Sequence, residues 1–365
     1  MNDFRYITAH SDLVNESKEL QKTPSLAIDI ECENNLHHFG TYISLLQISS
    51  EKKNWIIDVL LLKQINPLIE IFEDQKIQKI FHDINFDLRI ISHQFSCKVR
   101  NFFDTQLAAE FLGKQKISLG SLLKEYFNLE KEEKYQRIDW TRRPLSNKML
   151  LYATQDSAHL LELKRKLELE LQEKHRLSWV YEECKYLESL PWEFKEQSHL
   201  DISGVKSMTP QQRAVLHALF EARKVLAKEI DRPSFMIFSN KLLITFAKNP
   251  PISWKTLPGV HPLVRQRASF FSETVKKSSL ENEENARTEH WHLTTEEYQK
   301  IKMILEKRNE IAEKLGIKGH LVLKEEQVRE MVVTKSLQKL RPWQKELFAK
   351  EDINNIIPDL KNDFS

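Results

Sequence analysis

The sequence predicts an α/β domain followed by all-helical domains. Strand-like apolar runs alternate with amphipathic helical patterns up to residue 195, which is typical of one sheet covered by helices. Beyond residue 196 only helical patterns follow, separated by proline-containing breaks. The low counts of 7 Gly and 12 Pro favour helices and disfavour an all-β fold. Because 365 residues suit two or three domains, we place these at residues 1–195, 205–280 and 288–365.

Periodicity and cap residues justify the elements of the α/β region in turn. Ser11 caps a short amphipathic helix, and a turn at residues 52–54 joins two strands that could pair as a hairpin. The predicted strands are residues 25–32, 43–49, 53–58 and 79–82. The predicted helices are residues 12–21, 66–73, 83–91, 104–111, 118–127 and 146–174.

The helical region begins after a polar linker at residues 196–207. Thr209 and Pro210 form a favourable N-cap and N1 pair, and Arg232-Pro233 stops the helix that they start. The further predicted helices are residues 239–247, 262–275, 294–315, 324–331 and 334–340.

Charge is distributed unevenly, although the whole chain carries a net charge of only +2. Between Ser203 and Ser272 there are 11 Lys or Arg and 3 Asp or Glu, a net charge of +8. A basic helical module on an acidic remainder indicates nucleic-acid binding through phosphates. The alternative is an uneven but solvated surface.

The cysteine pattern and the hydropathy of the chain indicate the cellular compartment of the protein. Cys32, Cys97 and Cys184 are scattered and form no C-x-x-C, so we expect neither a disulfide framework nor a zinc site. This fits a reducing compartment, and we expect a cytoplasmic protein. The N-terminus lacks an apolar signal core and no run of about 18 apolar residues occurs, so no membrane association is expected. No obligate protein partner is evident.

The strand at residues 25–32 carries two carboxylates on one face. Side chains alternate along a strand, so Asp29 and Glu31 point the same way. Two neighbouring acids at a buried strand end each lose water and repel each other. A hard divalent cation between them would remove both penalties. The alternative is a strand end in solvent, where the acids cost nothing.

Further acids and a tyrosine follow on helices. Asp87 lies in the first turns of a helix after a strand, where the helix dipole favours a carboxylate with or without a further role. Asp83 and Asp104 are explained as helix caps. Tyr152 and Asp156 are four residues apart and share a helix face. They either point into one cleft or form a rim tyrosine and a solvated acid.

Taken in order, these motifs resemble the DEDDy 3′-5′ exonucleases and, within them, the ribonuclease D family. The D-x-E motif is matched by Asp29 and Glu31, the next acid by Asp87, and the Y-x-x-x-D motif by Tyr152 and Asp156. The segment Asp-Trp-Thr-Arg-Arg-Pro-Leu at residues 139–145 resembles the stretch that precedes the last motif in that family. The similarity covers roughly residues 5–175.

The resemblance implies a ribonuclease H-like fold with a mixed five-stranded sheet flanked by helices. It also implies four carboxylates that hold two divalent metal ions, with Mg²⁺ or Mn²⁺ expected for oxygen ligands. By the family pattern Asp29 bridges both ions, Glu31 and Asp156 complete the first site, and Asp87 helps to hold the second. Tyr152 would orient the attacking water.

Substrate contacts are predicted from side-chain chemistry. Arginines suit phosphates and a Trp can stack on a base, so Arg137, Trp140, Arg142 and Arg143 are candidate substrate-binding residues. In the alternative, the Trp packs under a loop and the arginines are solvated. His82 either contacts substrate or makes a hydrogen bond at the end of its strand.

Three short segments in the helical region carry a second resemblance. Residues 232–239, 249–251 and 257–260 resemble the HRDC domain, an auxiliary nucleic-acid-binding module of helicases and ribonuclease D. Residues 341–348 resemble the end of a second, divergent HRDC-like unit. The three predicted domains are therefore a 3′-5′ exonuclease domain, an HRDC domain and a divergent HRDC-like domain.

Our hypothesis from sequence is a metal-dependent 3′-5′ exoribonuclease that releases nucleoside 5′-monophosphates from RNA with a free 3′ end. The resemblance alone suggests tRNA precursors as substrate. The alternatives are a DNA 3′-5′ exonuclease, which can use the same four acids and tyrosine, and a non-catalytic RNA-binding protein.

Overall fold

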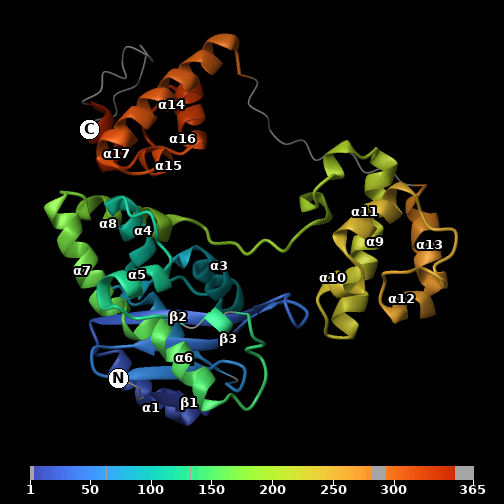
Figure 1. Ribbon diagram of the computed structural model, residues 1–365, viewed down its shortest axis with the longest axis horizontal. Helices are drawn as coiled ribbons and strands as arrows, with labels where there is room; N and C mark the ends of the chain where they lie inside the picture. The colour runs from blue at the N-terminus through green and yellow to red at the C-terminus, as the bar shows by residue number, and fades with distance from the viewer. Residues whose placement is uncertain (1–3, 63, 132, 136, 281–292, 350–365) are drawn as a thin grey trace. The chain divides into compact units, whose positions relative to one another are not determined.

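The computed structural model describes the chain except for residues 1–3, 63, 132, 136, 281–292 and 350–365 (Figure 1). The chain divides into two compact units. The first unit comprises Met1–Glu31, Ile43–Glu193 and Trp291–Ser365, and the second comprises Cys32–Tyr42 and Phe194–His290. The three-domain division expected from the sequence stays a prediction.

A mixed six-stranded sheet forms the centre of the first unit. Its strands are β1 (Arg5–Ile7), β2 (Ser25–Asn34), β3 (Thr41–Ser49), β4 (Asn54–Asp58), β5 (Gln78–Phe81) and β6 (Phe102–Asp104). The strand order is β1-β4-β3-β2-β5-β6. β1 is parallel to β4, β5 is parallel to both β2 and β6, and β3 is antiparallel to β4.

The predicted α/β fold with a mixed sheet is confirmed, but the sheet has six strands rather than five. The sequence patterns identified β2 to β5 only. The strands at the two edges, β1 and β6, have three residues each, which is too short for an alternating pattern to stand out.

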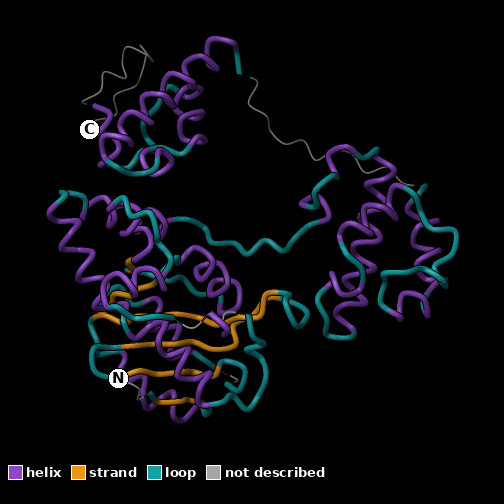
Figure 2. The backbone as a smooth tube through the Cα atoms, in the orientation of Figure 1, coloured by secondary structure: helices purple, strands orange, loops and turns teal. Residues whose placement is uncertain are grey.

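Helices flank this sheet (Figure 2). They are α1 (His10–Leu20), α2 (Asn66–Glu73), α3 (Ile84–Phe95), α4 (Thr105–Leu112), α5 (Leu119–Phe127), α6 (Asn147–Ala158), α7 (Leu160–Glu173) and α8 (Leu177–Ser189). Helix α6 contacts β4, α7 contacts β5 and α4, and α8 contacts β6. The single helix predicted at residues 146–174 is wrong, because the chain bends at His159 and α6 and α7 pack against different elements.

The central strands are deeply buried in the first unit. Leu26 and Ile28 of β2, Leu46 of β3 and Ile56 of β4 are all fully buried. Burying a Leu or Ile side chain contributes about 1.5–3 kcal/mol, so this layer holds β2 firmly in place. A rigid central strand is a suitable base for side chains that must converge.

Helix α9 (Pro210–Glu229) organises the helices of the second unit. The others are α10 (Ser234–Ile237), α11 (Asn240–Lys248), α12 (Pro262–Gln266) and α13 (Ala268–Ser278). Helix α9 packs against α10, α11 and α13 around a core that includes Trp254 and Phe271, stacked with ring centroids 5.0 Å apart. The predicted cap at Thr209 is confirmed, since its side chain accepts a hydrogen bond from the Gln212 backbone.

Four C-terminal helices belong to the first unit: α14 (Thr295–Leu315), α15 (Gly319–Val322), α16 (Glu325–Thr334) and α17 (Pro342–Ala349). The helix predicted at residues 334–340 is wrong. Lys335 has a φ of +52°, which ends α16, and the next helix starts only at Pro342. A proline is favoured at the start of a helix and disfavours helical conformation in the residue before it.

Trp343 attaches α17 to the α/β part of this unit. Its ring stacks on Trp179 at 4.8 Å and meets Phe111 edge-on at 5.4 Å. Its indole N–H donates a 3.0 Å hydrogen bond to Glu183, which also accepts a 2.7 Å hydrogen bond from Arg341. The buried ring, its hydrogen bond and the ion pair together fix the C-terminal helices on α8.

A close backbone approach supports the same contact. Gly113, which ends α4 with a φ of +81°, would place a Cβ only 2.1 Å from the carbonyl oxygen of Gly316. Arg176 donates hydrogen bonds to the carbonyls of Phe111 (2.8 Å) and Leu315 (2.7 Å) on the two sides. Glycine at residue 113 is therefore required both by its backbone conformation and by the available space.

Across the part of the chain that the structure describes, no helix combines the length and the apolar character needed to cross a membrane. Cys32, Cys97 and Cys184 are free thiols.

Replacing Trp343 with Ala should destabilise the first unit by about 3–5 kcal/mol, because a buried aromatic ring and its hydrogen bond to Glu183 are lost. Urea denaturation followed by circular dichroism measures the change. Tyr298→Ala, at an exposed position of α14, is the control and should change the unfolding free energy by less than about 0.5 kcal/mol. A loss below about 1 kcal/mol for Trp343→Ala would show that the C-terminal helices do not depend on this contact.

Candidate active site

Strand β2 presents Asp29 and Glu31 from the middle of the sheet. It is bordered by β3 on one side and β5 on the other, with Leu26 in register with Lys79. Asp29 and Glu31 are two residues apart and both are partly buried. The strand therefore holds both carboxylates on one face, as the alternation of its side chains predicts.

Asp87 is positioned by the start of α3, and Asp104 holds that start in place. The Asp104 carboxylate accepts hydrogen bonds from the backbone N–H groups of Asp83 (3.0 Å) and Ile84 (3.2 Å). It also caps α4 through Gln106, so the prediction of a cap at Asp104 is confirmed. The predicted cap at Asp83 is wrong, because this residue has a φ of +62° and its side chain makes no capping hydrogen bond.

Helix α6 brings Tyr152 and Asp156 to the same place. Both side chains are buried. One carboxylate oxygen from each of Asp29, Glu31 and Asp156 lies within 4.8 Å of the others. Asp87 does not belong to this close group, but its charge raises the pKa of Glu31, and the charge of Asp29 raises the pKa of Asp87. The structure thus gathers four acids from β2, α3 and α6 into one site.

Burial raises the pKa values of all four acids, and repulsion from neighbouring acids adds to the effect for Asp29, Glu31 and Asp87. Burial raises the pKa of Asp29 to about 8, with the charge of Asp156 adding to the effect. Burial, followed by the charge of Asp29, raises the pKa of Glu31 and of Asp87 well above the usual range. The pKa of Asp156 is also raised, again chiefly by burial. The site therefore holds too little positive charge to stabilise all four acids in their ionised form.

A hard divalent cation fits this site. Its donors are carboxylate oxygens, its three nearest carboxylates converge, and a positive ion would relieve the repulsion that raises their pKa values. The convergence comes from three elements that are far apart in the sequence. Together these observations favour a metal site over a solvated strand end.

Lys131 is a member of the site that the sequence did not reveal. It follows α5, and its ammonium group forms an ion pair with the Oδ1 atom of Asp156. The Nζ atom also lies 5.1 Å from the centre of the Tyr152 ring. The segment around Lys131 is rich in both signs of charge, so no pattern distinguishes this lysine from its neighbours.

The segment at residues 139–145 is fixed by a buried ion pair. Arg143 donates to both oxygens of Asp58 (2.5 and 2.8 Å) and to the carbonyl of Trp140 (2.8 Å). The ring of Trp140 is buried and stacks near that of Tyr152, with centroids 6.1 Å apart. Asp58, at the end of β4, was not identified from the sequence.

The structure therefore places Trp140 and Arg143 differently from what their predicted substrate-binding role requires. Trp140 is buried and packs against Tyr152 within the domain, which agrees with the packing alternative, while a role in substrate contact stays a prediction. Arg143 has its guanidinium committed to Asp58 and to backbone carbonyls. Arg137 is exposed, and Arg142 is exposed beside Asp139 at 3.2 Å. For these two arginines substrate contact stays a prediction.

His82 makes the hydrogen bond at the end of its strand. Its Nδ1 atom lies 2.9 Å from the Thr105 hydroxyl, which itself donates to the carbonyl of Phe81. Burial, with the nearby charge of Lys131, lowers the pKa of His82 to about 4. The ring is therefore neutral at pH 7, and a role for His82 in substrate contact stays a prediction.

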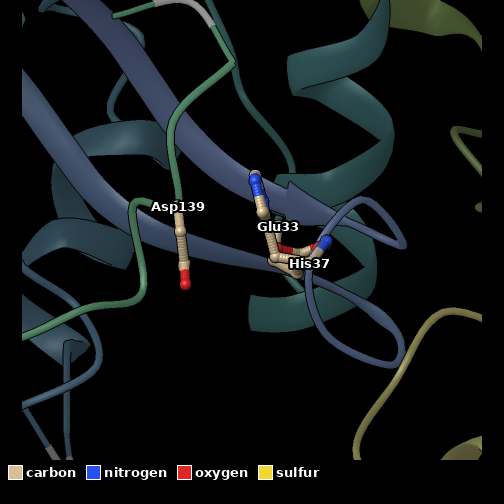
Figure 3. Close-up of side chains that lie close together, drawn as sticks. All are labelled: Glu33, His37 and Asp139. Atoms are coloured by element: carbon tan, nitrogen blue, oxygen red, sulfur yellow. The ribbon is translucent and has the colours of Figure 1, made fainter.

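Glu33 is a third acid on β2, but it serves the turn that follows. Its carboxylate accepts hydrogen bonds from the backbone N–H groups of Leu36 (2.5 Å) and His37 (3.0 Å), and the His37 ring lies 3.5 Å away. Figure 3 shows Glu33 and His37 close together, and it also labels Asp139, which accepts hydrogen bonds from Thr141 in its own loop. Local hydrogen bonds thus explain why Glu33 is buried.

Comparison with known proteins agrees with this architecture. A family model described as a 3′-5′ exonuclease matches residues 4–172, and the HRDC domain model matches residues 212–275. Fold and site together define a 3′-5′ exonuclease domain of the DEDDy type followed by an HRDC domain. The predicted fold class and family are confirmed.

Ribonuclease D is a homologue of this chain. The chain is 27% identical over 288 residues to ribonuclease D of Pseudomonas paraeruginosa, covering 76% of this chain and 75% of that protein. It is 28% identical over 279 residues to the exosome complex component 10 homolog of Drosophila melanogaster, covering 72% of this chain but only 30% of that protein. The crystal structure of Escherichia coli RNase D superposes with a TM-score of 0.73 at 23% identity, covering 98% and 99% of the two chains. The predicted relationship to ribonuclease D is therefore confirmed.

The raised acid pKa values predict how the metal-free protein responds to pH. A pKa of about 8 for Asp29 in the folded state exceeds its value near 3.9 in the unfolded chain, so folding favours the protonated form. With EDTA present, wild-type stability should fall relative to Asp29→Asn as the pH rises from about 5 to about 8, and level off above that. Thermal denaturation of both proteins across this range measures the effect. If the stabilities of the two proteins changed with pH in parallel, the close packing of acids around Asp29 would be contradicted.

Proposed function

We propose that the protein is a metal-dependent 3′-5′ exoribonuclease that releases nucleoside 5′-monophosphates from RNA with a free 3′ end. The observation that carries this proposal is the convergence of Asp29, Glu31 and Asp156 within 4.8 Å beside Tyr152, in a chain homologous to ribonuclease D. Asp29, Glu31, Asp87, Tyr152 and Asp156 are the proposed catalytic residues.

The proposed cofactors are two divalent ions, Mg²⁺ or Mn²⁺, because every candidate ligand is a carboxylate oxygen. A pair of such ions supplies an activated water and neutralises charge on the leaving oxygen in phosphodiester hydrolysis. Asp29 would contact both ions, Glu31 and Asp156 one of them, and Asp87 the other. The elements that carry these acids hold them in place before any ion binds.

Tyr152 orients the attacking water in this proposal. Burial raises the pKa of Tyr152 to about 12, so its hydroxyl stays protonated at neutral pH and acts through hydrogen bonding, not as a base. Its ring is held by Trp140 and by Tyr135, whose ring centre lies 5.0 Å away. This packing fixes the direction of the hydroxyl.

The proposed substrate is structured RNA, with tRNA precursors as the candidate class. The E. coli RNase D structure is described as that of an exoribonuclease involved in structured RNA processing, and the second unit of this chain is basic. The chain spans only 30% of the length of the exosome complex component 10 homolog of Drosophila melanogaster. We therefore propose no assembly partner from that similarity. The three free thiols support a cytoplasmic location.

A DNA 3′-5′ exonuclease is the second candidate function. The matched family model is described as a 3′-5′ exonuclease without reference to RNA, and four acids with a tyrosine suit either polymer. A non-catalytic RNA-binding protein is disfavoured, because a scaffold does not need four crowded carboxylates with raised pKa values.

Degradation assays on matched substrates test the proposed activity. With Mg²⁺, RNA ending in a 3′ hydroxyl should be shortened one nucleotide at a time, while EDTA or a 3′ phosphate should stop the reaction. Asp29→Asn should lower the rate by about a thousandfold or more, because an acid that would bind both ions is lost. Asp12→Asn, at a half-buried position of α1, a helix that carries none of the acids of the site, is the control and should leave the rate unchanged.

The products decide between the candidate functions. Faster degradation of the DNA oligonucleotide would favour the DNA exonuclease. Internal fragments would contradict attack from the 3′ end, and binding without cleavage would favour the scaffold.

The basic second unit predicts salt-dependent RNA binding. Lys241 and Lys248 are exposed on α11, and replacing both with Ala should weaken binding of single-stranded RNA. The slope of log Kobs against log salt should fall by about 1.4, since each phosphate contact contributes about 0.7. Fluorescence anisotropy in EDTA measures this without degradation. The control variant replaces Lys18, in the last turn of α1, and Lys22, which follows that helix, with Ala and should keep the slope of the wild type. Equal slopes for the two variants would argue against α11 as an RNA contact.

A further inference from the structure

We infer that Lys131 is a built-in counter-cation of the acid site, one that competes with a divalent metal ion for Asp156. The inference rests on the proposed metal site and adds a residue outside its set of acids. We describe Lys131 as a positioning residue because it would affect the reaction only through Asp156, the acid with which it forms an ion pair.

The geometry places this ammonium group within the acid site. Lys131 lies on the loop between α5 and the 3₁₀ helix at Glu133–Tyr135, and its side chain is only 15% exposed. It forms an ion pair with the Oδ1 atom of Asp156, a member of the close carboxylate group. The flanking Tyr152 ring, 5.1 Å away, leaves the ammonium group little contact with solvent. A lysine on a surface loop would ordinarily be solvated instead.

The charge of Lys131 reaches beyond its direct partner. It lowers the pKa values of Asp29, Glu31 and Asp156, each of which is raised overall by burial. Burial alone would lower the pKa of Lys131, but the neighbouring Asp156 raises it, so the lysine stays charged. A single positive charge therefore offsets part of the repulsion among the acids.

A divalent ion bound by Asp156 would meet this lysine at the same carboxylate. Two cations that share one carboxylate repel each other, and the repulsion is strong where water is excluded. Lysine is a compact charge on a flexible stem, so it can leave the carboxylate without a change in the fold. Lys131 should therefore weaken metal binding and stabilise the site when no metal is bound.

Lys114 offers a matched control in the same unit. Its side chain is also 15% exposed, it pairs with Glu125 at 2.8 Å, and its Nζ atom lies 4.7 Å from the centre of the Tyr126 ring. It differs from Lys131 in that its partners do not belong to the acid site.

Binding of Mn²⁺ to the full chain tests the inference directly. Isothermal titration calorimetry at pH 7.5 compares the wild type with Lys131→Met, Lys131→Arg and Lys114→Met. We expect Lys131→Met to bind Mn²⁺ about tenfold more tightly, because a nearby positive charge is removed. Lys131→Arg, which keeps the charge, and Lys114→Met should both stay within about twofold of the wild type. If Lys131→Met does not fold, Lys131→Gln takes its place.

Thermal denaturation supplies a second readout that does not depend on catalysis. In EDTA, Lys131→Met should melt below the wild type, because the acids lose their counter-cation. In saturating Mn²⁺ this difference should disappear, since the ion takes over that role.

The outcomes separate this inference from the metal site on which it rests. If the wild type binds no Mn²⁺, the metal site itself is wrong. If the wild type binds Mn²⁺ and Lys131→Met binds it equally or more weakly, only the role of Lys131 is refuted. An equal gain in affinity for Lys114→Met would refute it as well, because the effect would then be one of net charge.

Discussion

Repulsion among buried carboxylates is the constraint around which the first unit is built. Asp29, Glu31 and Asp156 meet within 4.8 Å, and burial raises the pKa of each. Such an arrangement opposes folding and persists only when the surrounding structure holds it. The buried centre of the sheet supplies that support on one side, and the ion pair from Lys131 offsets part of the charge on the other.

Buried polar contacts outside the acid site hold the elements that carry its residues. Asp104 connects the end of β6 to the starts of α3 and α4, which places Asp87. Asp58 holds Arg143 at the end of β4, and through it the loop that seats Trp140 beside Tyr152. Neither Asp104 nor Asp58 belongs to the close carboxylate group, yet each fixes an element on which the site depends.

The two units differ in the charged residues that they carry. The first carries the crowded acids, while the basic stretch between Ser203 and Ser272 lies wholly in the second. Acids that bind metal ions also repel a phosphate backbone, so attraction of a nucleic acid is better supplied by separate basic residues. The C-terminal helices join the first unit through Trp343.

Local patterns were sufficient for much of this molecule. Alternation along β2 predicted that Asp29 and Glu31 share a face, and helical spacing did the same for Tyr152 and Asp156, because both periodicities are properties of the backbone alone. The cap at Thr209 followed from the residue types at positions 209 and 210 in the same way. The edge strands β1 and β6 could not be found by this route, since three residues carry no period.

The sequence by itself determined which acids share a face, the cap at Thr209, and the family to which the motifs point. Only the tertiary structure decided what surrounds the acids. The packing of Trp140 against Tyr152, the ion pair of Arg143 with Asp58 and the ion pair of Lys131 with Asp156 all join residues at least 12 positions apart. Contacts of this kind depend on how helices, strands and loops pack against one another. The periodicity of a single strand or helix does not predict that packing.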